Sequence, residues 1–118
     1  MKKLVIIGEG RSHYICDWCN SLNEMGWKVY LVTLDSLDAT FKKNRYSSNI
    51  SIHSFSSRRL PKISVFLNMI NVYFLLRKIK PDLVQIHDIL GFGHLPFFYN
   101  KCPVVGYEWG FYNHIALR

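Results

Sequence analysis

The chain has 118 residues, of which 49% are hydrophobic and 19% are charged, and its formal net charge at pH 7 is +7. This length suits one domain with a buried core, and the composition excludes an intrinsically disordered chain. Three cysteines, an odd number, exclude a fully paired disulfide scaffold and favour a reducing, cytoplasmic compartment. The short apolar run behind Lys2 and Lys3 predicts a strand rather than an export signal.

The first elements predict the opening of a doubly wound α/β domain. Leu4 to Ile7 are apolar and mostly β-branched, which is typical of a strand buried on both faces of a parallel sheet. Gly8 and Gly10 then break the strand, and a helical pattern follows over residues 14–25. Ligands of such folds lie at the carboxyl ends of the strands, so this glycine turn is the first candidate site.

The rest of the chain alternates between strand-like and helical patterns. Ser12 is placed to cap the first helix and Gly26 to end it. Residues 63–79 predict a second helix with one narrow polar stripe at positions 64, 68, 71 and 78, and a shorter helix is expected at 94–99. Further strands are expected at 27–33, 50–55 (at a sheet edge), 83–87 and 103–107, with a largely irregular loop at 35–49, containing a helical turn around Phe41, and a basic loop at 56–62.

These elements predict a single Rossmann-like α/β domain over residues 1–118. Its sheet is expected to be mostly parallel, with about five strands and with helices on both faces. The apolar segment 63–79 is expected to be a crossover helix rather than a membrane span, since a span needs about 20 apolar residues and this segment contains two asparagines. A helix lying flat on a membrane stays open as a third interpretation.

The glycine turn contains part of a dinucleotide-binding pattern, G-x-G-x-x-G. His13 stands where the third glycine would allow close helix packing, so NAD binding is not favoured, although Asp35 lies where a ribose-binding acid is expected. Free backbone N–H groups at a helix N-terminus still favour an anion such as a diphosphate. The candidate diphosphate site therefore consists of Gly8, Gly10, Arg11, Ser12 and His13.

A second motif, Cys16-Asp17-Trp18-Cys19, has the spacing of a redox pair or of half a zinc site. Cys19 falls on the apolar face of the expected helix, and no second pair completes a zinc site. We therefore expect core thiols, and no metal site.

Polar and aromatic residues also follow three of the expected strands. His13 follows the first strand, His87 and Asp88 follow another, and Glu108, Trp109 and Gly110 follow the last. Carboxyl ends of parallel strands share one edge of a sheet, so these residues predict a cleft, although each alone is more often structural. No nucleophile–base order, P-loop or metal-ligand cluster is present in the sequence.

Residues 42–80 contain nine basic residues and no acid. Such a window attracts anionic lipid, nucleic acid or a phosphorylated substrate, and it is equally typical of a solvated surface. A recognition-helix or RNP-type pattern is missing, so no nucleic-acid partner is expected.

The order of these motifs resembles the N-terminal domain of family-4-type retaining glycosyltransferases of the GT-B superfamily. The matching segments are the strand, glycine turn and helix from Leu4, then Gly26-Trp27-Lys28-Val29 for the usual "GheV". Lys80 to His87 match "kPDivh.H", and Cys102 to Gly110 match "pvv…wGsD". The resemblance covers nearly the whole chain.

The resemblance implies the acceptor-binding lobe of a two-lobed enzyme, with a donor-binding C-terminal lobe missing from this chain. Such an enzyme transfers a sugar from a nucleotide sugar, with no further cofactor, to a glycan or polyprenyl-linked acceptor in polysaccharide or lipopolysaccharide biosynthesis. The lobe alone is expected to be inactive. The glycine turn with Arg11 to His13 would face the donor diphosphate, His87 and Asp88 the acceptor, and Glu108 to Gly110 the transferred sugar.

The catalytic residue is not identified, because Trp109 stands where many members have His, and Phe111-Tyr112 replace Ser-Asp. The basic window fits a peripheral position at the inner face of the cell membrane, with a membrane-facing patch of Lys42, Lys43, Arg45, Arg58, Arg59 and Lys62. The alternative is a stand-alone Rossmann-like module that binds a nucleotide or a protein without catalysis.

Overall fold

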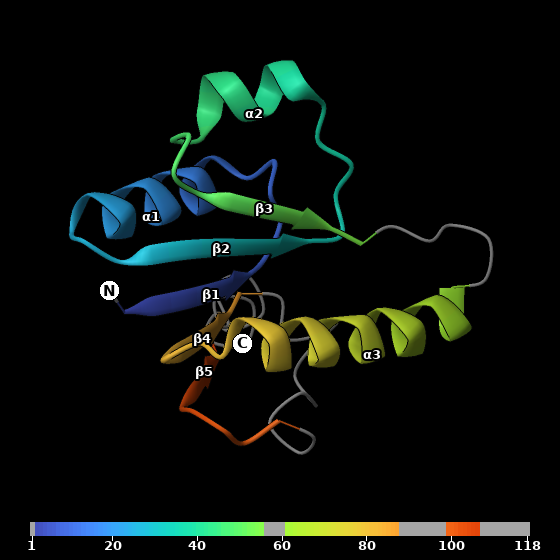
Figure 1. Ribbon diagram of the computed structural model, residues 1–118. Coiled ribbons are helices and arrows are strands. Elements are labelled where there is room, and N and C mark those ends of the chain that lie inside the picture. Colours follow the sequence, from blue (N-terminus) through green and yellow to red (C-terminus); the bar gives the residue numbers. More distant parts are fainter. Residues whose placement is uncertain (1, 56–60, 88–98, 107–118) are drawn as a thin grey trace, which may run out of the picture.

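A computed structural model describes residues 2–55, 61–87 and 99–106, with residues 61–66 described by their backbone alone (Figure 1). Its centre is a parallel five-stranded sheet with the strand order β3-β2-β1-β4-β5. The strands are β1 (Lys3–Ile7), β2 (Lys28–Thr33), β3 (Ser51–Ser54), β4 (Leu83–Ile86) and β5 (Val104–Gly106). The helices are α1 (His13–Glu24), α2 (Ala39–Arg45) and α3 (Pro61–Ile79). This order confirms the predicted Rossmann-like α/β fold.

The central strand β1 explains why the opening stretch is apolar at every position. Residues Leu4 to Ile7 are all 0% exposed, because β1 pairs with β2 on one side and with β4 on the other. Alternate side chains enter two separate cores: Leu4 and Ile6 pack under α1, while Val5 and Ile7 pack under α3. The sheet is therefore covered on both faces, as predicted.

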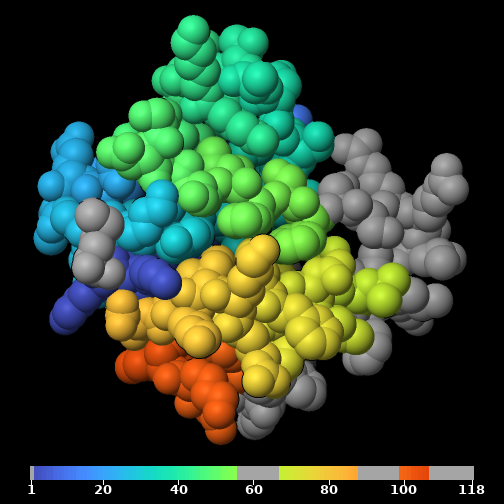
Figure 2. Space-filling model, viewed as in Figure 1, coloured from blue at the N-terminus to red at the C-terminus, as the bar shows by residue number. Residues whose placement is uncertain are grey.

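Helices α1 and α3 lie on opposite faces of the sheet (Figure 1). Ile15, Cys16 and Cys19 attach α1 to one core, and Val72, Leu76 and Ile79 attach α3 to the other. Figure 2 shows α3 lying across its face of the sheet, between the end of β3 and the segment 99–106. The chain leaves β1, β2 and β4 at the carboxyl edge of the sheet.

The end of α1 has the predicted glycine geometry. Gly26 has a φ of +102°, its N–H bonds to the carbonyl of Asn23, and the N–H of Trp27 bonds to the carbonyl of Leu22. This pair of bonds is a Schellman motif, which a side chain at Gly26 would strain. Ser12 occupies the N-cap position as predicted, but its side chain makes no capping bond, which corrects that expectation.

Two segments expected to be loops are partly helical. Ala39–Arg45 form a two-turn helix, because the carboxylate of Asp38 accepts a hydrogen bond of 2.7 Å from the N–H of Phe41 and caps the first turn. Helix α3 starts at Pro61 rather than at residue 63, since proline is favoured in the first turn of a helix. The expected short helix at 94–99 lies almost wholly outside the described residues.

The predicted polar stripe of α3 is wrong at Asn68, which is only 7% exposed, whereas Asn71 and Lys78 are exposed as a polar stripe requires. The apolar Leu67 and Phe74 are 48% and 62% exposed. The reason is that α3 is apolar on nearly every side, so its few polar residues do not decide which face meets the sheet. Among the described residues, none of the helices combines the length and the apolar character that crossing a membrane requires.

Candidate functional site

The candidate site lies at the carboxyl edge of the sheet, where the chain leaves β1, β2 and β4. The N–H of Gly8 bonds to the carbonyl of Val32 at 3.0 Å, and the N–H of His87 bonds to the carbonyl of Ile7 at 2.7 Å. These bonds extend the strand pairing by one residue and bring the glycine turn beside His87. The structure therefore confirms that these two predicted features are neighbours.

Packing within the domain already favours glycine at both positions. A Cβ atom at Gly8 would lie 3.0 Å from Cδ1 of Ile15 and 3.2 Å from Cβ of His87. At Gly10 it would lie 2.8 Å from Cδ1 of Leu37. Close approach of a ligand is therefore not needed to explain why these positions are glycine.

Several N–H groups of the turn have partners inside the protein. Gly10 donates to Oγ1 of Thr33 at 3.0 Å, and the N–H of Arg11 donates to the carboxylate of Asp35 at 3.2 Å. The N–H of Ser12 bonds to the carbonyl of Glu9. Asp35, considered above as a ribose-binding acid, instead holds the turn in place in this structure.

The carbonyl of Gly10 accepts hydrogen bonds from two side chains. The Tyr46 hydroxyl donates to it at 2.5 Å, and the Cys16 thiol lies 3.6 Å away. Tyr46 is 5% exposed, and burial, followed by its contact with Cys16, raises the pKa of its hydroxyl. The phenol therefore stays protonated and serves as a hydrogen-bond donor to the turn.

His87 lies against Trp18 of α1. The two rings form an edge-to-face pair with centroids 5.3 Å apart, and the Trp18 indole N–H donates to Oε1 of Gln85 at 2.7 Å. Burial lowers the pKa of His87 to about 4, because the charged imidazolium is desolvated there. At neutral pH the ring is therefore uncharged, able both to donate and to accept a hydrogen bond.

A further contact joins α1 to α2 above the turn. Nη1 of Arg45 lies 3.0 Å from Nδ1 of His13, and since a guanidinium can only donate, Nδ1 is the acceptor. The Arg11 guanidinium donates to the carbonyl of Ser36 at 2.7 Å. Arg45 and His13 thus form one exposed pair, and the Arg11 guanidinium contacts the segment after β2.

The basic window does not form a single surface. Lys42, Lys43 and Arg45 lie on α2, whereas Arg77 and Lys78 lie at the far end of α3 (Figure 1). Lys62 lies 15 residues before Arg77 on α3, a separation of about 23 Å along the helix. Of the predicted membrane-facing patch, Arg58 and Arg59 fall outside the described residues, and only the backbone of Lys62 is described.

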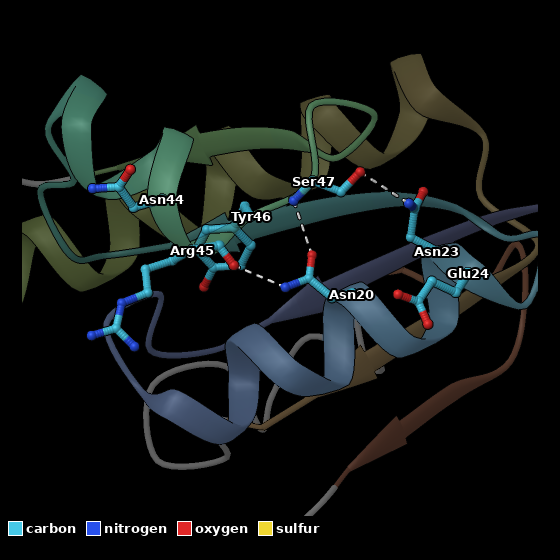
Figure 3. A pocket seen from close by; sticks show the side chains of 7 residues that line it. All are labelled: Asn20, Asn23, Glu24, Asn44, Arg45, Tyr46 and Ser47. Atoms are coloured by element: carbon cyan, nitrogen blue, oxygen red, sulfur yellow. Dashed lines mark hydrogen bonds between the residues drawn. The ribbon is translucent and has the colours of Figure 1, made fainter.

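A polar hollow of about 360 Å³ lies between α1 and the end of α2 (Figure 3). Asn20 accepts from the N–H of Ser47 and donates to the carbonyl of Arg45, and Asn23 donates to the Ser47 hydroxyl. The amides thus hold the connection after α2 onto α1. In Figure 3 the Arg45 side chain extends away from these amides, toward the start of α1.

The predicted core thiols are confirmed. Cys16 and Cys19 are 4% and 0% exposed, and burial raises the pKa of Cys19 to about 12, which keeps it a thiol. In the described part of the chain, no three His, Cys, Asp or Glu side chains are grouped so that they could hold a metal ion.

The remaining predicted site residues, Asp88, Glu108, Trp109 and Gly110, lie outside the described residues. Conversely, sequence reasoning missed Thr33 and Tyr46 as supports of the turn, and Trp18 as the neighbour of His87. The helical spacing of Ile15, Trp18 and Cys19 assigns Trp18 to the apolar face of the helix, but no local pattern pairs it with His87. Tyr46 lies in a polar segment, where no periodicity marks it as buried.

Comparison with known proteins gives one family match. The family model described as "Glycosyl transferase 4-like" matches residues 3–113. No curated protein matches the chain.

Solved structures share the fold at low sequence identity. A glycosyltransferase from Rickettsia africae ESF-5 has a TM-score of 0.64 at 9% identity, and the match covers 89% of this chain and 29% of that one. A structure titled as a UDP-N-acetylglucosamine 2-epimerase from Listeria monocytogenes has a TM-score of 0.62 at 15% identity, covering 96% of this chain and 33% of that one.

The C-terminal domain of a hydrogenase from Pyrococcus furiosus also matches, with a TM-score of 0.64 at 12% identity, over 89% of this chain and 88% of that one. The chain thus spans about a third of the Rickettsia and Listeria proteins and most of the Pyrococcus domain.

Proposed function

Because the chain belongs to the glycosyl transferase 4-like family, we propose that it is the acceptor-binding lobe of a glycosyltransferase. In this proposal a second, donor-binding lobe supplies the nucleotide sugar, and the lobe alone does not catalyse transfer. The sugar passes to a glycan or polyprenyl-linked acceptor of the kind used in polysaccharide or lipopolysaccharide biosynthesis. The family match over residues 3–113, which includes every candidate site residue, carries the proposal.

The geometry supports a donor diphosphate bound through side chains rather than through the turn backbone. The N–H groups of Gly8, Gly10, Arg11 and Ser12 already have partners. Arg11 and His13 remain exposed beside them, and a guanidinium binds phosphate oxygens in a bidentate manner. In the proposal these two side chains face the diphosphate across the cleft.

On the acceptor side, the neutral His87 ring supports a hydrogen bond to a sugar hydroxyl. Trp18 fixes the ring edge-to-face, and a fixed ring loses little freedom when an acceptor binds. Asp88 and the segment Glu108 to Gly110 stay proposed neighbours of the acceptor and of the transferred sugar.

A ligand-binding experiment distinguishes an acceptor site from a donor site in the cleft. The chain is titrated with a panel of nucleotide sugars and with short-chain polyprenyl phosphates and their sugar derivatives, and binding is followed by calorimetry. We expect binding of the acceptor series, with His87→Ala weakening it about tenfold or more, and weak binding of nucleotide sugars. Tight nucleotide-sugar binding that His87→Ala weakens more than acceptor binding would refute the assignment.

We also propose that the protein is cytoplasmic and binds peripherally to the inner face of the cell membrane. Lys42 and Lys43 on α2 support this, since each lysine near an anionic leaflet contributes about 1 kcal/mol. Arg45 is less available, because its guanidinium lies over Phe41 and beside His13.

Co-sedimentation with neutral and anionic vesicles tests this second proposal. Anionic vesicles should retain the wild-type chain, and Lys42→Gln and Lys43→Gln, made singly, should each weaken retention about fivefold. The exposed Lys2→Gln also removes one charge and serves as the charge-matched control. Equal retention by neutral and anionic vesicles would exclude the proposed electrostatic binding to the membrane.

A binding module without catalysis is the second candidate. The Pyrococcus domain supports it on the level of fold, because this chain covers 88% of that domain. If the chain binds nucleotides tightly and no polyprenyl-linked acceptor, this second candidate is favoured.

A further inference from the structure

A separate basic hollow lies at the opposite edge of the sheet, where β4 and β5 begin. Its volume is about 390 Å³, and it is lined by Arg77, Lys80, Pro81, Tyr99 and Lys101. Figure 2 shows the two contributing segments side by side, the end of α3 and residues 99–106. Three of the five lining residues are cations, and none is an acid.

Two of the lining residues, Arg77 and Tyr99, pack on the ring of Tyr73. Tyr99 is 2% exposed and packs edge-to-face on Tyr73 with centroids 6.3 Å apart, so the floor of the hollow belongs to the core. The Arg77 guanidinium lies over the Tyr73 ring, 5.9 Å from its centroid. Asp82, the nearby acid in the sequence, accepts a hydrogen bond from the N–H of Lys3 at 2.7 Å instead of lining the hollow.

Helix carbonyls at the end of α3 would oppose an anion, but two of them are satisfied. The N–H of Lys80 bonds to the carbonyl of Leu76 at 2.8 Å, and Nζ of Lys3 donates to the carbonyl of Ile79 at 3.0 Å. The negative end of the helix dipole is therefore offset by Lys3 and by the cations of the hollow.

Lys80 occupies a backbone conformation that favours glycine. Its φ is +55°, the only positive φ among the non-glycine residues that the structure describes, and it sits directly after α3 where glycine is usual. Lysine is strained there relative to glycine, and strain of this kind is retained where the side chain has a use. The Lys80 side chain lines the hollow.

We propose that this hollow, defined by Arg77, Lys80, Pro81, Tyr99 and Lys101, binds a soluble phosphate-bearing small molecule. The volume falls in the range of small-molecule sites, and two lysines with one arginine suit the two or three charges of a phosphate or diphosphate. The hollow lies at the amino ends of β4 and β5, away from the carboxyl-edge cleft, so this inference does not depend on the proposed function.

Lys80→Gly makes a sharp test because it should weaken binding without lowering the stability of the unliganded chain. Removing the strain should leave the Tm of the unliganded chain unchanged or raise it. Removing the cation should weaken the binding of inorganic diphosphate about tenfold. Binding is measured at low ionic strength from the diphosphate dependence of Tm and from amide chemical shifts.

A matched variant controls the experiment. Lys43→Ala removes one exposed cation from α2, away from the hollow, and should keep the wild-type affinity for diphosphate. Shifts should be largest at Arg77, Lys80 and Lys101. The proposal is overturned if Lys80→Gly retains full affinity, if Lys43→Ala weakens binding equally, or if the wild type does not respond to millimolar diphosphate.

Anionic vesicles distinguish a soluble ligand from a membrane headgroup at this hollow. If Lys80→Gly abolishes binding to vesicles while soluble diphosphate does not bind the wild type, the hollow contacts a membrane headgroup and the proposal of a soluble ligand fails. A loss of acceptor binding at His87, by contrast, would leave diphosphate binding at this hollow unchanged.

Discussion

The hydroxyl of Tyr46, just after α2, donates a hydrogen bond of 2.5 Å to the carbonyl of Gly10, in the turn after β1. This bond joins residues 36 positions apart and ties the second helix of the fold to its first turn. Since Tyr46 is 5% exposed, the bond is shielded from water, and the carbonyl would be poorly satisfied without it. The shape of the candidate diphosphate site therefore depends on a residue far from the glycine pattern.

Tyr46→Phe is expected to lower the free energy of unfolding by about 1–2 kcal/mol, because the Gly10 carbonyl would keep only the weak Cys16 thiol donor at 3.6 Å. Urea denaturation with an unchanged m-value would measure it. Tyr30→Phe is the matched control, since in the described part of the chain the Tyr30 hydroxyl makes no hydrogen bond and only its ring makes contacts. Equal losses in both variants would contradict the prediction.

Gly8→Ala is expected to destabilise the fold by about 1–3 kcal/mol, since the new Cβ would lie 3.0 Å from Cδ1 of Ile15. Ile15→Val removes that atom, so the double variant should be more stable than the sum of the single effects. Thermal unfolding of the four proteins measures the coupling. If Gly8→Ala keeps full stability, packing does not explain this glycine, and a ligand becomes the better reason for it.

The fold could be predicted because its strongest signals are local. The runs at 4–7, 27–33 and 83–87 are mainly apolar and rich in Val and Ile, and each forms a strand with bounds shifted by at most one residue. Gly26 ended α1 as expected, because the Schellman geometry favours glycine. The short helix α2 was underestimated because it has no apolar stripe, and only Asp38 marks its start.

The supports of the site could not be predicted, since they depend on distant contacts. Tyr46 reaches Gly10, and Asp35 reaches Arg11, only after the sheet has brought β1 and β2 together. Likewise, the apolar character of α3 on all sides hid the inward position of Asn68. A pattern can place a residue on an element, but not decide which of several similar faces packs against the sheet.

Trp18→Phe is expected to lower the free energy of unfolding by about 1–3 kcal/mol, because Oε1 of Gln85 loses its indole donor at 2.7 Å while Gln85 is only 7% exposed. Removing both partners, with Gln85→Leu in the Trp18→Phe background, should recover part of this loss, since no buried oxygen is then left unbonded. Chemical denaturation of the wild-type chain, the two single variants and the double variant completes the double-mutant cycle. If the double variant loses as much free energy of unfolding as the two single variants together, the proposed effect of the Trp18–Gln85 hydrogen bond is contradicted.

Acid is expected to destabilise the fold through His87. Its pKa is about 4 in the folded protein, because of burial, and 6.5 without that environment. Between these values the unfolded chain binds more protons than the folded one, so stability is full above about pH 6.5 and falls toward pH 4. Burial, with the charge of Lys78 second, also lowers the pKa of His53, which adds a loss of the same sign.

Because the His87 ring is half-buried and partly screened by water, we expect a loss of about 1–2 kcal/mol over this range. Urea denaturation at several pH values measures the slope, and NMR of the imidazole carbon protons measures each pKa. His87→Gln should remove most of the slope, whereas His53→Gln should remove a smaller part. A His87 ring that titrates near pH 6.5 in the folded chain would contradict the buried, neutral imidazole on which its proposed hydrogen bond to an acceptor depends.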